Sequence, residues 1–115
     1  METQEKLYDL SKLEKLCEGD KKFMDKMIQI FIRDTPSQIE KIKTGFELKD
    51  AEMVRFAAHR LKPAMQNICS KIMIDEVIFL EKETENGNLN EQVFEVSKRL
   101  EIHSNEIIKQ LLQRD

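Results

Sequence analysis

Apolar residues recur three and four positions apart over four long stretches of this chain, which is the spacing of one helix face. The stretches run from Lys21 to about Leu48, from Asp50 to about Cys69, from Ile72 to Glu85 and from Asn90 onward. No stretch alternates apolar and polar residues in the manner of a strand. Because the 115 residues include only three glycines and two prolines, little interrupts helix formation. The pattern predicts an all-α fold.

Polar residues and turns mark where the predicted helices begin and end. A short first helix is expected to end at Leu16, before the turn Glu18-Gly19-Asp20. The turn Asn86-Gly87-Asn88 separates the last two helices, because glycine adopts positive φ without strain. The expected N-caps, whose side chains can accept hydrogen bonds from free backbone amides, are Ser11, Asp20, Asp50 and Asn90.

The step Asp34-Thr35-Pro36 interrupts the first long helical stretch and allows two arrangements. In one arrangement Thr35 caps a new helix that has Pro36 at its first position. In the other, one long helix continues through Pro36 with a kink. The apolar stripe resumes in a compatible phase after the proline, so the sequence favours the single kinked helix.

Four amphipathic helices joined by short turns predict an antiparallel, up-down four-helix bundle with a short extra N-terminal helix. A chain of 115 residues is expected to form one domain spanning 1–115. Hydrophobic residues make up 40% of the chain and charged residues 36%, which fits a helical core inside a strongly solvated surface.

The charge pattern and the cysteines argue against several classes of protein. The net charge of −3 is mild and no basic block occurs, so nucleic-acid binding is not expected. No apolar run approaches the ~18 residues of a membrane span, and METQEKLYDL lacks a signal core, so membrane insertion is not expected. Two isolated cysteines favour a reducing compartment. We therefore expect a cytoplasmic protein, and the initial methionine favours a free-standing chain.

The two histidines, His59 and His103, fall on opposite kinds of helix face. His103 lies on the apolar stripe of its helix, where we expect a packed side chain satisfied by a neighbour. His59 lies on a polar face, so it is either a solvated surface residue or a reactive nucleophile. The residues that share this polar face are Glu52, Arg55, Lys62 and Gln66.

The surroundings of His59 favour chemistry with an anion. An ordinary imidazole has a pKa of about 6.5, so near pH 7 it is largely neutral and nucleophilic. Lys62, one helical turn later, can reach a phosphoryl group carried on His59. Pro63 removes the hydrogen-bond partner of the His59 carbonyl, which predicts a bend with or without a functional role. Phe56, also on the exposed side, is either tucked against a neighbouring helix or a docking contact.

Other chemistries find no support in the sequence. No GxxxxGK[ST] or GxGxxG motif is present, so the chain has no nucleotide-phosphate cradle and no kinase activity of its own is expected. The cysteines and histidines lack zinc spacing, and Glu-x-x-His pairs of di-iron bundles are missing. Cys17 is expected to pack in the core. The chain therefore carries one candidate reactive group, His59, and no kinase motif that could phosphorylate it.

The motif AHRLKP, residues 58–63, resembles the phosphoacceptor motif of histidine-containing phosphotransfer (HPt) domains, which are intermediates of two-component phosphorelays. The predicted bundle, the Gly19-Asp20 helix entry, the Asp34-Thr35-Pro36 kink and the Asp50 cap are also similar to the family. So is the Leu80-Glu81 pair followed by a Gly-Asn turn. The resemblance covers about residues 9–112, which we take as the domain core.

The resemblance implies roles for individual residues. His59 is expected to be the phosphorylated residue, Lys62 to stabilise the phosphoryl group, and Glu81 to orient the histidine through its other ring nitrogen; a solvated Glu81 is the alternative. The expected partners are response-regulator receiver domains or a hybrid sensor histidine kinase. No cofactor is expected on this chain, because the receiver supplies Mg²⁺. No ATP hydrolysis is implied, and one exposed active face suggests a monomer. The expected docking residues are Arg55, Phe56, Arg60, Pro63 and Gln66.

Two positions depart from the HPt pattern. Many family members have glycine after the lysine, where this chain has Pro63, and glycine ten residues after the histidine, where it has Cys69. Neither change removes a chemical group that transfer requires, although Cys69 puts a close backbone contact in doubt. An alternative interpretation is a helical-bundle adaptor that binds signalling proteins without transferring phosphoryl groups. A metal or small-ligand bundle lacks a supporting ligand set.

Overall fold

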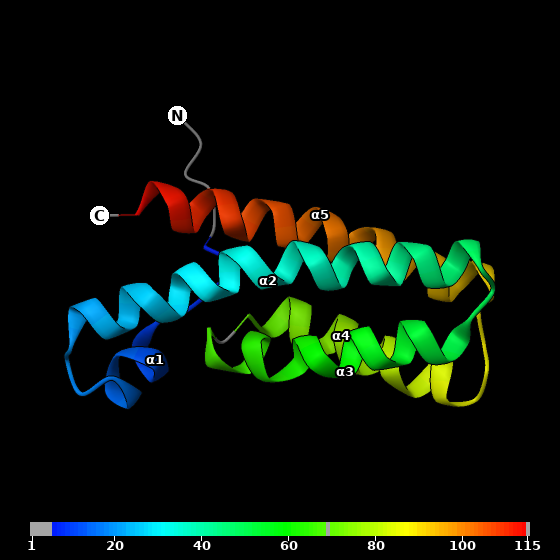
Figure 1. Cartoon of the computed structure of the whole chain (residues 1–115), viewed down its shortest axis with the longest axis horizontal. Helices are drawn as coiled ribbons and strands as arrows, with labels where there is room; N and C mark the ends of the chain where they lie inside the picture. The colour runs from blue at the N-terminus through cyan, green and yellow to red at the C-terminus, as the bar shows by residue number, and fades with distance from the viewer. Residues whose placement is uncertain (1–5, 69, 115) are drawn as a thin grey trace.

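The computed structural model describes residues 6–68 and 70–114, which form five helices and no strand (Figure 1). The all-α prediction is therefore confirmed. The helices are α1 (Ser11–Leu16), α2 (Lys21–Glu47), α3 (Ala51–Asn67), α4 (Lys71–Glu85) and α5 (Glu91–Gln113). Predicted and observed bounds agree to within two residues, and Cys69, near the expected end of the third helix, lies outside the described residues.

Side-chain caps fix the starts of the three longest helices. The oxygens of Asp20, Asp50 and Asn90 accept hydrogen bonds from the backbone amides three residues later, at 3.0–3.1 Å. These three predictions are confirmed. The prediction that Ser11 caps the short first helix is wrong, because Ser11 is the first helical residue of α1. Its amide instead donates to Asp9 Oδ1 at 2.9 Å.

Helix α2 is continuous through Pro36, so the arrangement with a new helix at Thr35 is wrong. Pro36 is exposed, and its ring therefore does not disturb the packed face of the helix. Phe23, near the start of the helix, is half exposed, whereas Ile28 is buried. The buried residues of α2 keep a three- and four-residue spacing across the proline; they are Ile28, Phe31, Thr35, Ile39, Ile42 and Gly45.

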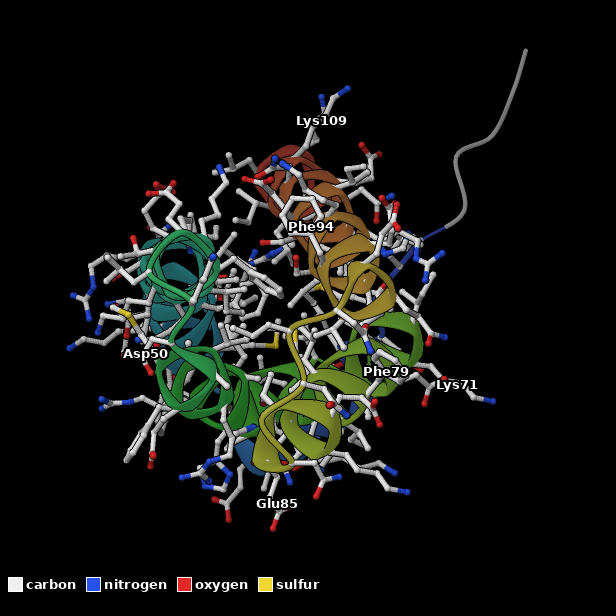
Figure 2. All side chains as sticks on the ribbon, turned by 90° about the vertical axis from the view of Figure 1, so that its right-hand side faces the viewer. Asp50, Lys71, Phe79, Glu85, Phe94 and Lys109 are labelled. Atoms are coloured by element: carbon white, nitrogen blue, oxygen red, sulfur yellow. The ribbon has the colours of Figure 1, made fainter. Side chains whose placement is uncertain are left out.

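The four long helices contact one another in a ring: α2 with α3, α3 with α4, α4 with α5, and α5 with α2. Successive long helices run in opposite directions along the molecule (Figure 1). Figure 2, viewed along the helices, shows side chains from all four directed into a shared interior. Its largest fully buried side chains are Ile42, Leu61, Met65, Met73, Leu80, Leu100 and Ile107. None of the helices in the described part of the chain is long and apolar enough to span a membrane.

Gly45 permits a close approach between α2 and the start of α3. A Cβ atom at this position would lie 2.6 Å from Val54 Cγ2 and 3.1 Å from the Val54 backbone nitrogen. The Asp50 amide donates to the Gly45 carbonyl at 2.8 Å across the intervening turn. Any larger residue at position 45 must therefore push the two helices apart.

The N-terminal segment ties together the ends of helices that are distant in sequence. The Asp9 amide donates to the carbonyl of Ile68 at 2.8 Å, and the Leu7 amide donates to Gln110 Oε1 at 3.1 Å. Tyr8 and Leu13 are buried and join the hydrophobic core. Helix α1 and residues 7–10 therefore cover the core beside the C-terminal ends of α3 and α5.

Candidate functional site

His59 projects from the outer face of α3. Its side chain is 62% exposed, whereas Ala58 and Leu61 on either side of it in the helix are buried. Helix α3 continues through Pro63, which has no N–H to donate to the carbonyl of His59. The predicted exposure of His59 is confirmed.

Glu81 of α4 binds the ring of His59. One carboxylate oxygen, Oε2, is hydrogen-bonded to His59 Nδ1. An ionised carboxylate only accepts hydrogen bonds, so the proton of this bond belongs to Nδ1. In the neutral ring Nε2 then keeps its lone pair, which makes it the nucleophilic nitrogen.

Lys62 binds the other oxygen of the same carboxylate. Its Nζ donates to Glu81 Oε1 at 2.9 Å, and the Lys62 and Glu81 side chains are 30% and 19% exposed. Glu81 therefore bridges the two α3 residues that the sequence singled out. The contact between Lys62 and Glu81 was not predicted, because sequence spacing does not fix how α4 is aligned against α3.

The environment of Glu81 keeps its carboxylate ionised. Burial alone would raise the pKa of Glu81, but hydrogen bonds from Lys62 and His59 outweigh this, and electrostatic interaction with both residues adds to the effect. The pKa of Glu81 therefore lies below its usual value. An ionised Glu81 is the state in which it can accept from both neighbours at once.

The packing of α4 explains why Glu81 reaches α3. Val77 and Leu80 are fully buried, and Glu81 follows Leu80 at the edge of the packed face. Thr84 Oγ1 donates to the carbonyl of Leu80 at 2.6 Å within the same helix turn. The sequence places apolar Ile78 directly after Val77, but the side chain of Ile78 is 45% exposed. The buried face of α4 is therefore narrower than the sequence suggested.

Exposed Phe56 and partly exposed Arg55 form a surface pair on α3, one turn before His59. Phe56 is 57% exposed, so the alternative in which it tucks against a neighbouring helix is wrong. The Arg55 guanidinium lies 5.4 Å from the centre of the Phe56 ring, and its Nη2 donates to Glu52 Oε1 at 3.2 Å. These contacts hold an aromatic ring and a cation at the surface beside the histidine.

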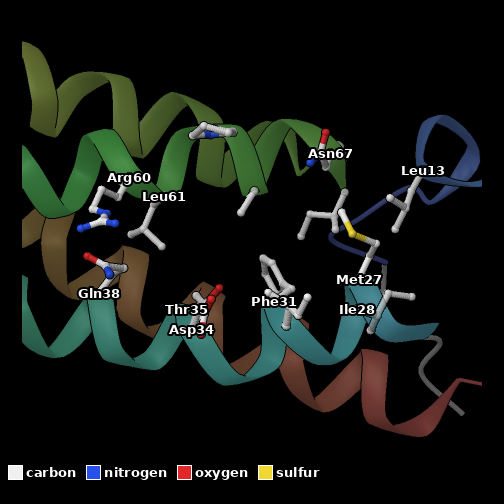
Figure 3. Close-up of a pocket in the computed structure, with 14 residues that line it drawn as sticks. Leu13, Met27, Ile28, Phe31, Asp34, Thr35, Gln38, Arg60, Leu61 and Asn67 are labelled. Atoms are coloured by element: carbon white, nitrogen blue, oxygen red, sulfur yellow. The ribbon is translucent and has the colours of Figure 1, made fainter. Parts of the chain in front are cut away.

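A groove of about 360 Å³ lies between α2 and α3 (Figure 3). Arg60 and Gln38 face each other across it from the two helices, and Asp34 lies beside them on α2 (Figure 3). Pro63 also lines the groove. Of the predicted docking residues, Arg60 and Pro63 therefore border this groove, while exposed Gln66 and the Arg55–Phe56 pair lie elsewhere on α3.

His103 of α5 is packed and paired, as predicted. Its side chain is 22% exposed, and Nδ1 lies 2.8 Å from Glu76 Oε2 and 3.0 Å from Glu76 Oε1. Glu76 belongs to α4 and is buried. Burial raises the pKa of Glu76, against the opposing effects of His103 and of Arg99. Helix α4 thus supplies one carboxylate to each histidine of the chain.

Among residues 6–68 and 70–114, no group of three or more His, Cys, Asp and Glu side chains is arranged to hold a metal ion. Cys17 is buried, as predicted. The departure from the HPt pattern at Cys69 lies outside the described residues. The side chain of His59 is bound by the carboxylate of Glu81, and this carboxylate also binds the ammonium of Lys62.

Comparisons with models of protein families, with curated proteins and with solved structures find no match to this chain. The likeness to HPt domains accordingly rests on the residues that carry it in the sequence. The hydrogen bond between His59 and Glu81 is independent of that likeness and bears on the reactivity of the imidazole.

Proposed function

We propose that this chain is a phosphorelay intermediate built as an antiparallel, up-down four-helix bundle with a short extra N-terminal helix. In this function His59 accepts a phosphoryl group from the aspartyl phosphate of a receiver domain and passes it to another receiver aspartate. The observation that carries the proposal is the hydrogen bond between exposed His59 Nδ1 and Glu81. This bond leaves Nε2 with a free lone pair on a solvent-exposed ring.

The transfer step needs little from this chain beyond a positioned nucleophile. The Nε2 lone pair attacks phosphorus, the bond from phosphorus to the aspartyl oxygen breaks, and the aspartate leaves with the bonding electrons as a carboxylate. The second transfer is the reverse reaction with a different aspartate. Mg²⁺, held by the receiver, offsets the charge of the phosphoryl oxygens. No nucleotide takes part in either step.

Lys62 provides a positive charge beside His59, because the two side chains bind the same carboxylate. Its ammonium is already within one side-chain length of the His59 ring, because both bind Glu81. Arg55 is engaged with Glu52 and stacked on Phe56. We therefore assign the stabilisation of the transferring phosphoryl group to Lys62.

The receiver is proposed to dock over the α3 surface that surrounds His59. Exposed Phe56 supplies an apolar anchor, and Arg55 and Arg60 supply positive charge beside it. Such a surface is complementary to the acidic pocket in which a receiver holds Mg²⁺. Pro63 and Gln66 continue this surface along the helix. We expect the protein to act as a monomer in the cytoplasm, where receiver domains are found.

The test is phosphoryl transfer from ³²P-labelled receiver domains to the wild-type chain, beside His59→Gln and His103→Gln variants. We expect acid-labile, alkali-stable label on the wild type and on His103→Gln, and none on His59→Gln. The His103 variant is the matched control, because it removes the other histidine. Receivers that bind the wild type and the His59→Gln variant equally well, without labelling either, would contradict the proposal in favour of the adaptor interpretation.

A further inference from the structure

His59 and Lys62 share one carboxylate, and this arrangement has to change when a phosphoryl group arrives. Glu81 holds the ring through Nδ1 and the ammonium of Lys62 at 2.9 Å. The nucleophilic nitrogen, Nε2, is on the other side of the ring from Nδ1. In the observed state Lys62 is therefore bound on the Nδ1 side of the ring and is paired with Glu81, not with the place where phosphorus binds.

We infer that Glu81 is a positioning residue that exchanges one cation for another during transfer: it releases Lys62 to the phosphoryl group as the His59 ring becomes positively charged. This inference rests on the proposed function. It assigns to Glu81 a role in the charge balance of the reaction, in addition to fixing which ring nitrogen carries the proton.

The charges balance as follows. Before transfer the ring is neutral, and the single negative charge of Glu81 is offset by Lys62. When the Nε2 lone pair forms the bond to phosphorus, the ring keeps its Nδ1 proton and becomes an N-phosphoimidazolium with one positive charge. Glu81 then faces this new positive charge directly through its existing hydrogen bond. The negative charge of Glu81 is then shared between Lys62 and the His59 ring. The anionic phosphoryl oxygens become a stronger partner for the Lys62 ammonium than Glu81 is.

The exchange requires only side-chain rotation. His59 and Lys62 are three residues apart on α3, so their Cβ atoms are about 5–6 Å apart. The Lys62 side chain is partly exposed and has a flexible four-carbon stem. Glu81, by contrast, is held at the edge of the packed α3–α4 seam beside buried Leu80. The carboxylate stays in place while the ammonium moves.

The experiment uses phosphoramidate as a small phosphoryl donor, so that no receiver is needed. In this reaction the phosphorus–nitrogen bond of the donor breaks, ammonia leaves and the bond to Nε2 forms. The rate of phosphorylation is compared between the wild type, Glu81→Gln and the matched control Glu85→Gln, an exposed glutamate on the same helix. A glutamine at position 81 can still accept from Nδ1 through its amide oxygen, so this variant removes the charge while retaining the hydrogen-bond acceptor.

We expect Glu81→Gln to be phosphorylated at least about tenfold more slowly than the wild type, by analogy with loss of a fixed electrostatic partner. Nitrogen-15 spectra of the ring should still show the proton on Nδ1, which separates loss of charge from loss of orientation. The Lys62 Nζ resonance should shift when the wild type is phosphorylated. Glu85→Gln should react at the wild-type rate.

Each failure has a distinct meaning. If the wild type is labelled and Glu81→Gln reacts within about twofold of it, against the tenfold loss expected for a fixed charge, the exchange role of Glu81 is wrong and the proposed function stands. A Lys62 Nζ resonance that is unchanged on phosphorylation also overturns the exchange. If the wild type takes no label from the donor at His59, the proposed function and the inference both fail.

Discussion

The Nζ atom of Lys62 lies 2.9 Å from Oε1 of Glu81, although the two residues belong to different helices. The cation expected to stabilise a phosphoryl group is thus held by the same carboxylate that binds His59. This hydrogen bond connects the two parts of the candidate site, His59 and Lys62 on α3 and Glu81 on α4. It also suggests variants that test the site without disturbing the core.

Replacing Lys62 by alanine should slow transfer and leave the fold intact. Loss of the ammonium removes the phosphoryl-binding charge, and we expect a rate reduction of about tenfold or more. Glu81 keeps His59 as a partner, so the melting temperature should change by no more than about 2–4 °C. Transfer assays and thermal unfolding measure the two effects. Lys71→Ala, at an exposed position on α4, is the control, and a Lys62→Ala rate equal to that of Lys71→Ala would contradict the role.

Replacing Phe56 by alanine should weaken receiver binding with little effect on stability. The ring is 57% exposed, so its removal leaves no cavity, whereas an aromatic anchor at an interface typically contributes more than ~1 kcal/mol of binding energy. Phe23→Ala is the matched control, since Phe23 is 50% exposed on a different helix. Binding is measured by titration calorimetry with a receiver domain. Equal weakening by both variants, or unfolding of Phe56→Ala, would show that Phe56 is not a docking residue.

Two of the glutamates of α4, Glu81 and Glu76, should affect stability with opposite dependence on pH. The pKa of Glu81 lies below the usual 4.5, so its charged form stabilises the fold above that pH, and the contribution is lost as pH falls through the folded pKa. The pKa of Glu76 lies above 4.5, so its neutral form is favoured, and stability is lost as pH rises through the folded pKa.

Urea unfolding from pH 3 to pH 8 checks this prediction. Relative to Glu81→Gln, the wild type should gain stability as pH rises through the region near 4.5. Relative to Glu76→Gln, the wild type should lose stability as pH rises above 4.5. Two difference curves with the same sign of slope would show that one of the two carboxylates has been assigned the wrong environment.

Introducing alanine at Gly45 should destabilise the protein. The added Cβ would lie 2.6 Å from Val54 Cγ2, and overpacking of this kind costs about 1–3 kcal/mol. The better helix propensity of alanine returns up to about 1 kcal/mol, so we expect a net loss. Denaturant unfolding measures it. In a Val54→Ala background the clashing methyl group is absent, so the same substitution should cost less there; an equal cost in both backgrounds would exclude the clash.

Local features of the fold were predictable because they depend on neighbouring residues in the chain. The caps at Asp20, Asp50 and Asn90 and the continuity of α2 through Pro36 follow from short-range rules, and the structure agrees. The exposure of His59 also followed from the phase of a single helix. The prediction for Ser11 failed because Ser11 is the first residue of α1, and its own amide donates to Asp9 Oδ1.

Features that depend on the fit between helices were not predictable in this way. Phe23 lies at helical spacing from Met27 and Phe31, yet the packing leaves Phe23 half exposed and buries Ile28. Nothing in the sequence around Gly45 indicates that α3 approaches it closely. The pairing of Lys62 with Glu81 depends on how α4 lies along α3, which periodicity leaves undetermined.

The division of the site between two helices means that the complete site exists only in the folded chain. A peptide covering α3 contains His59 and Lys62, but Glu81 lies on the next helix and reaches them through packing of buried side chains such as Leu80. Detachment of α4 would therefore remove the Glu81 carboxylate from His59 and Lys62 even while α3 stayed helical. If the chain serves a phosphorelay, copies in which α4 is not packed against α3 lack the complete site. The capacity to transfer phosphoryl groups then depends on correct folding.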